Sequence, residues 1–387
     1  MRRLLGLLLL VSVPFGFGCS NAEPTGLPED GVFVGGASAE VKFRVETVAT
    51  GLEVPWAFAW LPNGDMLVTE RPGRVRILKN GELQPEPVHI LPDVEPSGES
   101  GLMDISVHPN FAENGFVYIA YAYRSDEKRV MVARYTLLDD KFTDKKIIVL
   151  RIPAATNHAG TRARFGPDGK LYVTTGDATK WDLAQDLTSL AGKTLRLNDD
   201  GSVPEDNPFV NQKGARPEIW SLGHRNAQGL AWQPGSGLMF QTEHGPSQFE
   251  GRGGGADEVN IVEAGKNYGW PTIYGTRTQP GMEAPLLEYT PACAPASGAI
   301  YNGDQFPAFK GNFFFGCLRG ARIIRVELDG RNVVRQEDLL SGNVGRVREV
   351  AAGPDGFLYF STSNRDGRGR PADNDDRIMR IVPALSN

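Results

Sequence analysis

A histidine that stands directly before an apolar run is the first residue suited to catalysis. His158 lies in the sequence ATNHAGTR, shortly before the segment that begins at Phe165. Imidazole titrates near neutral pH, so a histidine at the entrance of a strand is suited to act as a general base. A lone histidine is more often a surface residue or a satisfied core residue. On the residue type alone, both interpretations stay open.

Two further groups of residues supply positive charge. Arg225 and Asn226 adjoin in the sequence GHRNAQG, a pair that suits an anionic or carbonyl-bearing ligand and equally suits a structural arginine. Arg346 and Arg348 are two residues apart in GRVREV, so on a strand both guanidinium groups lie on the same face. Two cations on one face repel each other unless an anion lies between them. This spacing therefore favours a ligand that carries several carboxylates.

Oxygen donors for a hard metal ion are concentrated between residues 243 and 271. This stretch contains EHGP, DEVN and GKNYGWP, which combine carboxylates with glycine and proline. Carboxylates and backbone carbonyls are the ligands that Ca²⁺ prefers. A solvated Asp-Glu pair in a loop is the plainer interpretation. The sequence has no zinc-type spacing and no cluster of cysteine and histidine.

Each of these groups needs a rigid element to hold it, and the sequence offers a repeated one. An apolar run, a turn rich in proline, asparagine, aspartate and glycine, and a second apolar run recur six times. Each unit predicts a β-hairpin, because glycine supplies the positive φ angle that the turn requires. The turn glycines lie near residues 64, 115, 169, 237, 311 and 356.

Further strand candidates follow several hairpins, at 74–81, 130–138, 193–201, 322–330 and 377–383. A four-stranded unit repeated six times predicts an all-β fold, a six-bladed β-propeller with four-stranded antiparallel blades. One blade cannot bury both of its faces, so the blades must stack in a ring around a channel. A β-sandwich or two smaller β domains are the alternatives. In a propeller, the dispersed polar groups meet at one end of the channel.

Taken in order, the motifs resemble those of one known family. The segments NHAGTRARFGPDGKLYVTTGD, GHRNAQGLAW, EHGP, DEVN, GKNYGWP, GCLRGARIIRV and GRVREV together resemble the soluble glucose dehydrogenases and aldose sugar dehydrogenases. The resemblance covers about residues 45–383. It implies a six-bladed propeller that holds pyrroloquinoline quinone (PQQ) over its channel. It also implies oxidation of an aldose sugar at the anomeric carbon to a lactone, with hydride transfer to the quinone.

The resemblance assigns roles to the residues described above. His158 matches the catalytic base, and Arg225 matches a catalytic arginine that polarises the quinone oxygen, with Asn226 beside it at the cofactor. Arg346 and Arg348 match the pair that grips the carboxylates of the cofactor.

The same resemblance implies two calcium sites. Gly245 and Pro246 match positions whose backbone carbonyls hold a Ca²⁺ ion in the active site. Glu258 and Tyr268 match ligands of a second, structural Ca²⁺ ion.

Three residues depart from the family pattern at the expected cofactor site. Glu99 stands where many relatives have a glutamine that helps to place the histidine and the substrate, and a carboxylate there favours a protonated imidazole. Arg319 stands where relatives have a cofactor-binding lysine, so the charge is kept while the geometry changes. Asp104 replaces a usual glycine, and the loop 247–256 is longer than in compact relatives.

These departures keep other functions open. A non-catalytic propeller that binds carbohydrate or protein, having lost the cofactor, is the main alternative, because a fold does not determine a function. A propeller hydrolase such as a lactonase would need carboxylates at the strand entrances, where this sequence has mainly arginines. The net charge of −6 and the lack of a basic run argue against nucleic-acid binding.

The N-terminus predicts export. Residues 1–19 begin with two arginines, continue with a short leucine-rich run and end at Cys19, as in a signal peptide or a lipoprotein signal with a lipid anchor on that cysteine. Residues 20–40 resemble a flexible linker, and residues 41–387 form the expected catalytic domain. The expected location is the periplasm or the bacterial envelope. The external electron acceptor, a quinone or a cytochrome, leaves no motif.

Two cysteines remain in the expected domain. Cys293 and Cys317 are either joined in a disulfide, as an exported protein permits, or two buried and inert thiols.

Overall fold

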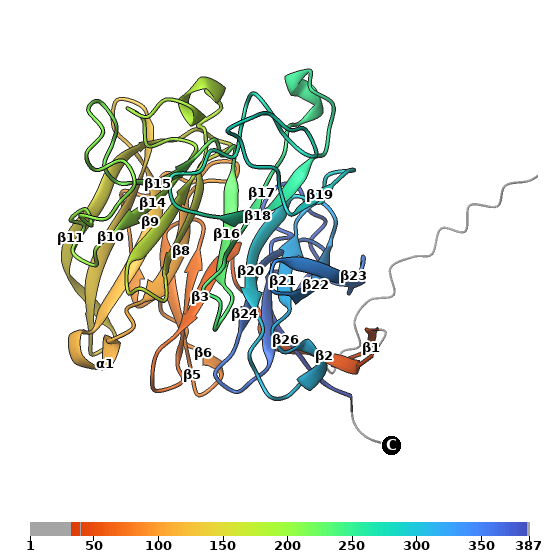
Figure 1. Cartoon of the computed structure of the whole chain (residues 1–387). Helices are drawn as coiled ribbons and strands as arrows, with labels where there is room; N and C mark the ends of the chain where they lie inside the picture. Colours follow the sequence, from red (N-terminus) through yellow and green to blue (C-terminus); the bar gives the residue numbers. More distant parts are fainter. Residues whose placement is uncertain (1–31, 39, 385–387) are drawn as a thin grey trace, which may run out of the picture.

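The computed structural model describes residues 32–38 and 40–384, and the expected signal segment 1–19 lies outside them. Six antiparallel sheets are arranged around a central channel, which confirms the predicted six-bladed β-propeller (Figure 1). Helical structure in the described residues is limited to the short helix α1, Phe111–Asn114, and three single turns of 3-10 helix. None of these helices is long and apolar enough to cross a membrane.

The first three blades follow one another along the chain, and each runs outward from the channel. Blade 1 contains β3 (Pro55–Trp60), β4 (Met66–Glu70), β5 (Arg74–Lys79) and β6 (Glu82–Leu83), with β7 (His89–Ile90) also paired to β5. Blade 2 contains β8 (Leu102–Val107), β9 (Phe116–Arg124), β10 (Lys128–Leu138) and β11 (Lys141–Pro153). Blade 3 contains β12 (Gly160–Phe165), β13 (Leu171–Thr175), β14 (Lys193–Leu197) and β15 (Ile219–Leu222).

The last three blades complete the ring. Blade 4 contains β16 (Ala227–Trp232), β17 (Met239–Glu243), β18 (Asp257–Val262) and β19 (Leu287–Tyr289). Blade 5 contains β20 (Pro295–Ile300), β21 (Phe313–Cys317), β22 (Arg322–Asp329) and β23 (Asn332–Leu339). Blade 6 contains β24 (Val347–Ala352), β25 (Leu358–Thr362), β26 (Ile378–Pro383), β2 (Lys42–Ala49) and β1 (Val32–Ala37).

The two ends of the domain close the ring in blade 6. Strand β2 pairs antiparallel with β26, with Val45 opposite Ile381, so the start of the domain supplies an outer strand to its last blade. Strand β1 pairs with β2 and adds a fifth strand. This strand lies within residues 20–40, the stretch that the sequence predicts as a linker.

The predicted hairpins all form between the two innermost strands of a blade. Their six turn glycines have positive φ angles between 65° and 91°, as the turn chemistry requires. The turns lie at the same end of the propeller as α1 (Figure 1). The entrances of the inner strands, which carry the predicted chemical residues, therefore meet at the opposite end.

A buried ionic cluster fills the channel beneath that end. The guanidinium of Arg162 donates to Asp104 at 2.9 Å and to Glu349 at 2.6 Å, and Arg164 pairs with the same two carboxylates. Asp104, which replaces a usual glycine of the family, therefore neutralises the positive charge of these two arginines of blade 3. A cavity of about 550 Å³ lies beyond this cluster, at the hairpin end of the channel.

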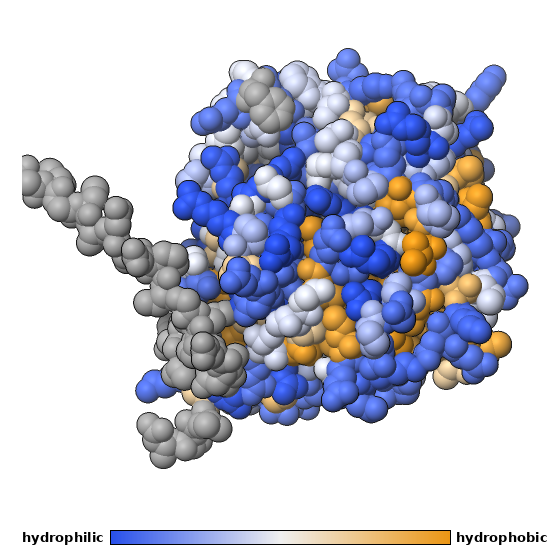
Figure 2. All heavy atoms as spheres, turned by 180° about the vertical axis from the view of Figure 1, so that it is seen from behind, coloured by the Kyte–Doolittle hydropathy of each residue, from blue (hydrophilic) through white to orange (hydrophobic). Residues whose placement is uncertain are grey.

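The outer surface is mainly polar. Figure 2 shows one face, on which hydrophilic side chains predominate and apolar residues are exposed in separate areas. The apolar residues of the described chain are instead concentrated between the blades, as in the cluster of Val45, Phe314, Val350, Phe360 and Ile381. Packing between neighbouring sheets is what holds the inner-strand entrances in place.

Candidate active site

A cavity of about 410 Å³ lies at the end of the channel opposite the hairpin turns. Its walls come from loops of five blades, and among the predicted residues it is lined by Glu99, His158, Arg225, Gly245, Pro246, Arg319 and Arg346. The other predicted residues, Asn226, Arg348, Glu258 and Tyr268, lie outside its lining. The fold therefore brings most of the predicted residues to one place.

His158 is held in one tautomer by two hydrogen bonds. Its Nδ1–H donates to Asp177 Oδ1 at 2.8 Å, while Nε2 accepts from Nη2 of Arg225 at 2.8 Å. Arginine can only donate, so Nε2 carries the lone pair and the ring is neutral. The side chain is buried, and its φ angle of 57° turns it into the cavity from the loop before β12. This arrangement is the one that a general base requires.

Asp177 was not predicted from the sequence, yet it orients the histidine. Besides His158, the carboxylate accepts from Trp270 Nε1 at 2.8 Å and from the backbone N–H of Thr179 at 2.7 Å. The segment before it is equally constrained, because a Cβ on Gly176 would lie 1.9 Å from the carbonyl oxygen of His158. The TTGD sequence at the end of β13 was the available signal.

Arg225 contacts the histidine and several other groups. Its guanidinium donates to Glu250 Oε2 at 2.7 Å and to the carbonyl of His244 at 3.0 Å, and it packs over the ring of Trp270. Its Nε is buried without a partner in the described residues. Glu250 lies in the long loop 247–256, so this loop supplies a counter-charge to Arg225.

Glu99 and Asn226 fix the backbone around the histidine. Glu99 Oε2 accepts from the backbone N–H of His158 at 3.2 Å and from Asn226 Nδ2 at 2.9 Å. Asn226 Oδ1 in turn accepts from the backbone N–H of Gly160 at 3.2 Å. The carboxylate thus contacts the main chain of His158, whereas the ring is held by Asp177. Asn226 supports the site from behind the cavity wall.

The pKa of Glu99 is lowered to about 2. Burial raises the pKa, but His244 and His158 in their protonated forms, the charge of Arg368 and the hydrogen bond from Asn226 lower it by more. A carboxyl whose pKa is lower in the folded chain than in the unfolded chain stabilises the fold above its unfolded value. That stabilisation is lost as the pH falls from about 4.5 towards 2.

Glu99→Gln is therefore expected to lower the free energy of unfolding at pH 6 by on the order of 3 kcal/mol. The difference between variant and parent should shrink at pH 3, because the parent is then losing the same contribution. Urea unfolding at the two pH values measures this, with exposed Glu86→Gln as the matched control. An equal loss at both pH values would contradict the assignment.

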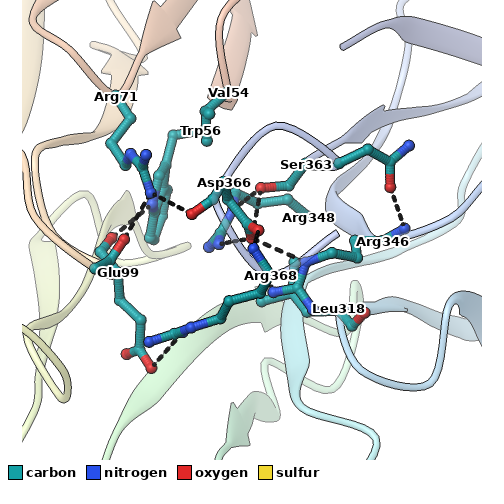
Figure 3. A network of polar contacts seen from close by, with 12 residues as sticks. Val54, Trp56, Arg71, Glu99, Leu318, Arg346, Arg348, Ser363, Asp366 and Arg368 are labelled. Carbon is teal, nitrogen blue, oxygen red and sulfur yellow. Dashed lines mark hydrogen bonds and ion pairs between the residues drawn. The ribbon is translucent and has the colours of Figure 1, made fainter. Parts of the chain in front are cut away.

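Arg346 and Arg348 share an anion that the protein itself provides. Asp366 Oδ2 lies 2.8 Å from Nη2 of Arg346 and 3.8 Å from Nη2 of Arg348, so the carboxylate stands between the two guanidinium groups (Figure 3). An anion does lie between the two arginines, as their spacing predicts, but it is a side chain of the protein, so the spacing alone does not require a ligand there. Asp366 follows β25 and is brought to the pair by the fold, which the spacing of the arginines did not reveal.

The two arginines differ in their access to the cavity. Arg346 lines it, whereas Arg348 is buried, donates to Gln228 at 3.3 Å and packs over Trp56. Burial lowers the pKa of Arg348 to about 9. The resemblance assigned both arginines to the cofactor. In the structure only Arg346 lines the cavity, whereas Arg348 faces the interior of the channel.

Two more cations complete the cavity wall. Arg368 reaches from the loop between β25 and β26 and donates to Asn157 at 2.7 Å and to Glu99 at 3.3 Å (Figure 3). Arg319 is exposed at the mouth, and within the described residues its guanidinium forms no hydrogen bond or ion pair. Arg368 was missed in the sequence because it lies outside every strand entrance.

The predicted metal ligands fall into two places. Gly245 and Pro246 line the cavity, and a Cβ on Gly245 would lie 2.1 Å from the carbonyl oxygen of Ala256, so carbonyls crowd there. Glu258 and Tyr268 line a small adjacent cavity. Burial and the nearby Glu243 raise the pKa of Glu258 to about 8, which marks a place where a cation would relieve repulsion. The described residues contain no cluster of three or more acidic, histidine or cysteine side chains suited to a metal.

Fold and cavity together define a β-propeller with one basic, histidine-bearing site at the end of its channel. The family model for glucose / sorbosone dehydrogenase matches residues 52–379, and the chain belongs to this family. The resemblance seen in the sequence is thereby confirmed.

Several relatives are similar over nearly their whole length. The aldose sugar dehydrogenase YliI of Escherichia coli is 36% identical over 350 residues, which cover 85% of this chain and 92% of that protein. A crystal structure of an oxidoreductase from Thermus thermophilus, described as a putative glucose dehydrogenase, has 44% identity and a TM-score of 0.81, covering 88% and 100% of the two chains. The PQQ-bound aldose sugar dehydrogenase of Streptomyces coelicolor has 32% identity and a TM-score of 0.78, covering 89% and 99%.

A more distant relative is not named as a dehydrogenase. The mouse Hedgehog-interacting protein is 26% identical over 332 residues, which cover 76% of this chain and 46% of that protein.

Proposed function

We propose that the protein is a PQQ-dependent dehydrogenase that oxidises aldose sugars at the anomeric carbon to lactones. One observation carries the proposal: a neutral imidazole, with its lone pair on Nε2 and its Nδ1–H bound to Asp177, faces a cavity lined by four arginines. The names of the bacterial relatives, which are aldose sugar and glucose dehydrogenases, support the same activity.

The residues of the cavity fit a planar, anionic cofactor. Its volume of about 410 Å³ lies in the range of small-molecule sites. Arg225, Arg319, Arg346 and Arg368 supply positive charge along its wall. Two buried side-chain nitrogens, Arg225 Nε and His244 Nε2, have no partner in the described residues and are available to a ligand. When bound, PQQ supplies the redox chemistry by accepting a hydride from the sugar.

The protein residues move one proton and orient the substrate. The anomeric hydroxyl of the sugar would take the place of Arg225 at His158 Nε2, and Nε2 would accept its proton. Asp177, already bound to Nδ1, would then stabilise the imidazolium that forms. Arg225, released from Nε2, would polarise the cofactor oxygen that gains negative charge. Asn226 and Glu99 would keep the histidine backbone in position.

We further propose that Ca²⁺ binds at both predicted places. Backbone carbonyls of Gly245 and Pro246 would hold the ion of the active site, where it would polarise the cofactor. Glu258 would bind the second ion through its side chain. The hydroxyl of Tyr268 donates to the carbonyl of Ile261 at 2.6 Å, so Tyr268 would contribute its backbone carbonyl.

The direct test is reconstitution. Purified protein is mixed with PQQ and Ca²⁺, and reduction of an artificial dye is followed with several aldoses, while the melting temperature is measured with and without PQQ. Turnover that requires both PQQ and an aldose supports the proposal. The absence of turnover, together with an unchanged melting temperature, would refute it.

The two neighbouring arginines allow a sharper prediction about PQQ binding. Arg346→Ala should weaken PQQ affinity about tenfold or more, because Arg346 lines the cavity and a charge-assisted contact would be lost. Arg348→Ala should change affinity much less and should instead lower the melting temperature, because Arg348 is buried against Trp56 and Gln228. Titration of PQQ fluorescence and thermal melts measure both effects. Equal losses of affinity would show that Arg348 also binds the cofactor.

A non-catalytic binding propeller is the alternative, and one observation favours it. Arg225 and Arg346 are already paired with Glu250 and Asp366, so part of the positive charge in the cavity is satisfied. Such a protein would bind a saccharide or a protein without PQQ. Binding of an aldose in the absence of PQQ, with no turnover in its presence, would favour this alternative.

We propose that residues 1–19 direct export and that residues 41–387 form the catalytic domain. The mature protein would then work in the periplasm, or on the bacterial envelope if Cys19 carries a lipid. Electrons would pass to an external quinone or cytochrome. Labelling with a radioactive fatty acid, compared between the parent and Cys19→Ala, tests the anchor.

A further inference from the structure

Cys293 and Cys317 lie side by side beneath the rim of the cavity. Both side chains are buried, and both are free thiols that lie close enough to interact with each other. A Cβ placed on Gly320 would lie 3.2 Å from the Cβ of Cys293 and 3.1 Å from that of Cys317, so both cysteines approach the same point. The backbone also joins the segments that carry the two cysteines, because the N–H of Leu318 donates to the carbonyl of Ala294 at 2.9 Å.

Each cysteine is flanked by residues that line the cavity. Ala292 and Ala294 stand on either side of Cys293, and Leu318 and Arg319 follow Cys317. The carbonyl of Cys293 accepts from the N–H groups of Arg319 and Gly320, at 3.0 and 2.9 Å. The two cysteines therefore join two rim segments that come from the start of β20 and the end of β21.

A third rim segment is tied to the same point. Asp257 Oδ2 accepts from the backbone N–H groups of Cys293 and Ala294, each at 2.7 Å, and Asp257 Oδ1 accepts from the N–H of Gly245 at 2.8 Å. A constraint at Cys293 would thus reach Gly245 and Pro246 through one carboxylate. Three segments of the rim share this support.

We propose that Cys293 and Cys317 form a disulfide that fastens the rim of the cavity. Two S–H bonds break and one S–S bond forms. Two protons are released, and two electrons reduce the disulfide of a thiol–disulfide oxidant to a dithiol. The bridge itself does not depend on the activity of the protein, whereas its effect on PQQ binding rests on the proposed function.

The bridge has to close while the chain folds. The interaction with Cys317 and burial raise the pKa of the Cys293 thiol, so very little of Cys293 is present in the folded chain as the thiolate that reacts with an oxidant. Once the rim has packed, neither sulfur is accessible to a protein oxidant. Refolding with oxidant present should give the bridge, and exposure of the folded dithiol to the same oxidant should give it far more slowly.

The full chain is tested after refolding with oxidised glutathione or with a reductant. Peptide mass spectrometry should find residues 293 and 317 linked only in the oxidised sample. The bridge closes about 25 residues of chain, so the oxidised form should melt about 5 °C higher than the reduced form. The double variant Cys293→Ala/Cys317→Ala should show no difference between the two conditions. Alkylation of both cysteines in the oxidised sample after unfolding would overturn the proposal.

PQQ titration separates the bridge from its effect on the rim. A fixed rim is expected to bind PQQ about tenfold more tightly in the oxidised form, because less ordering is required on binding. If the bridge forms and affinity is unchanged, the fastening of the rim is refuted. If neither form binds PQQ while the linked peptide is found, the proposed function fails and the disulfide stands.

Discussion

Replacing His158 by alanine is expected to lower kcat for aldose oxidation by about 10²–10⁴ and to leave PQQ affinity nearly unchanged. The imidazole is the group in the cavity that has a lone pair directed by a buried carboxylate, with Asp177 at 2.8 Å from Nδ1. Without it, the anomeric hydroxyl has no positioned base. Steady-state rates and PQQ titration of the same preparations measure the two effects separately.

Two variants control this experiment. Asp177→Asn keeps the size of the side chain but no longer favours the Nδ1–H tautomer, so kcat should fall while the fold is retained. His89→Gln changes a histidine on the outer strand β7, next to Tyr135, and should leave kcat as it is. Full activity in His158→Ala would show that another group accepts the proton.

Replacing Arg225 by methionine is expected to lower kcat by about 10²–10³, because a donor that stabilises developing negative charge is lost. The variant should also unfold at a lower temperature. Glu250 forms its ion pair with Arg225 where both side chains are only 3% exposed, and its carboxylate would be left buried without a counter-charge, bound only to the backbone N–H of Ser247. Such a loss costs about 3–5 kcal/mol.

The double variant Arg225→Met/Glu250→Gln distinguishes the two roles of Arg225. Removing the orphaned charge should restore most of the melting temperature, while kcat should stay low, because glutamine cannot replace the guanidinium at the cofactor. Thermal melts and dye-linked rates are compared for the parent, both single variants and the double variant. Recovery of kcat in the double variant would mean that Arg225 serves only to neutralise Glu250.

The fold was predictable because its signals are local. A turn glycine with positive φ and an apolar run on each side act within one hairpin, and all six predicted hairpins form. The closure of blade 6 was not predictable in this way. Strand β2 pairs with β26, more than 300 residues away, and no sequence feature of either segment indicates this pairing.

The site was predictable in part, for a related reason. His158, Arg225 and Arg346 precede inner strands, so the propeller brings them to one end of the channel, as expected. Arg348 lies inside β24, and its packing against Trp56 directs it into the channel. Which of two arginines on one face contacts a ligand depends on neighbours from other blades.

The sequence by itself determined the number of blades, the order of the chemical residues around the channel and the end at which they meet. Only the tertiary structure decided which charges are free to act. Glu250, Asp366 and Asp177 each bind a predicted residue that lies between 19 and 25 positions away along the chain. Hydrogen bonds and ion pairs act over a few ångströms in space, whereas sequence patterns report only neighbours along the chain. Each of these acids follows the second strand of an inner hairpin, and the residue that it binds precedes the first strand, so the pair meets only once the blade has folded.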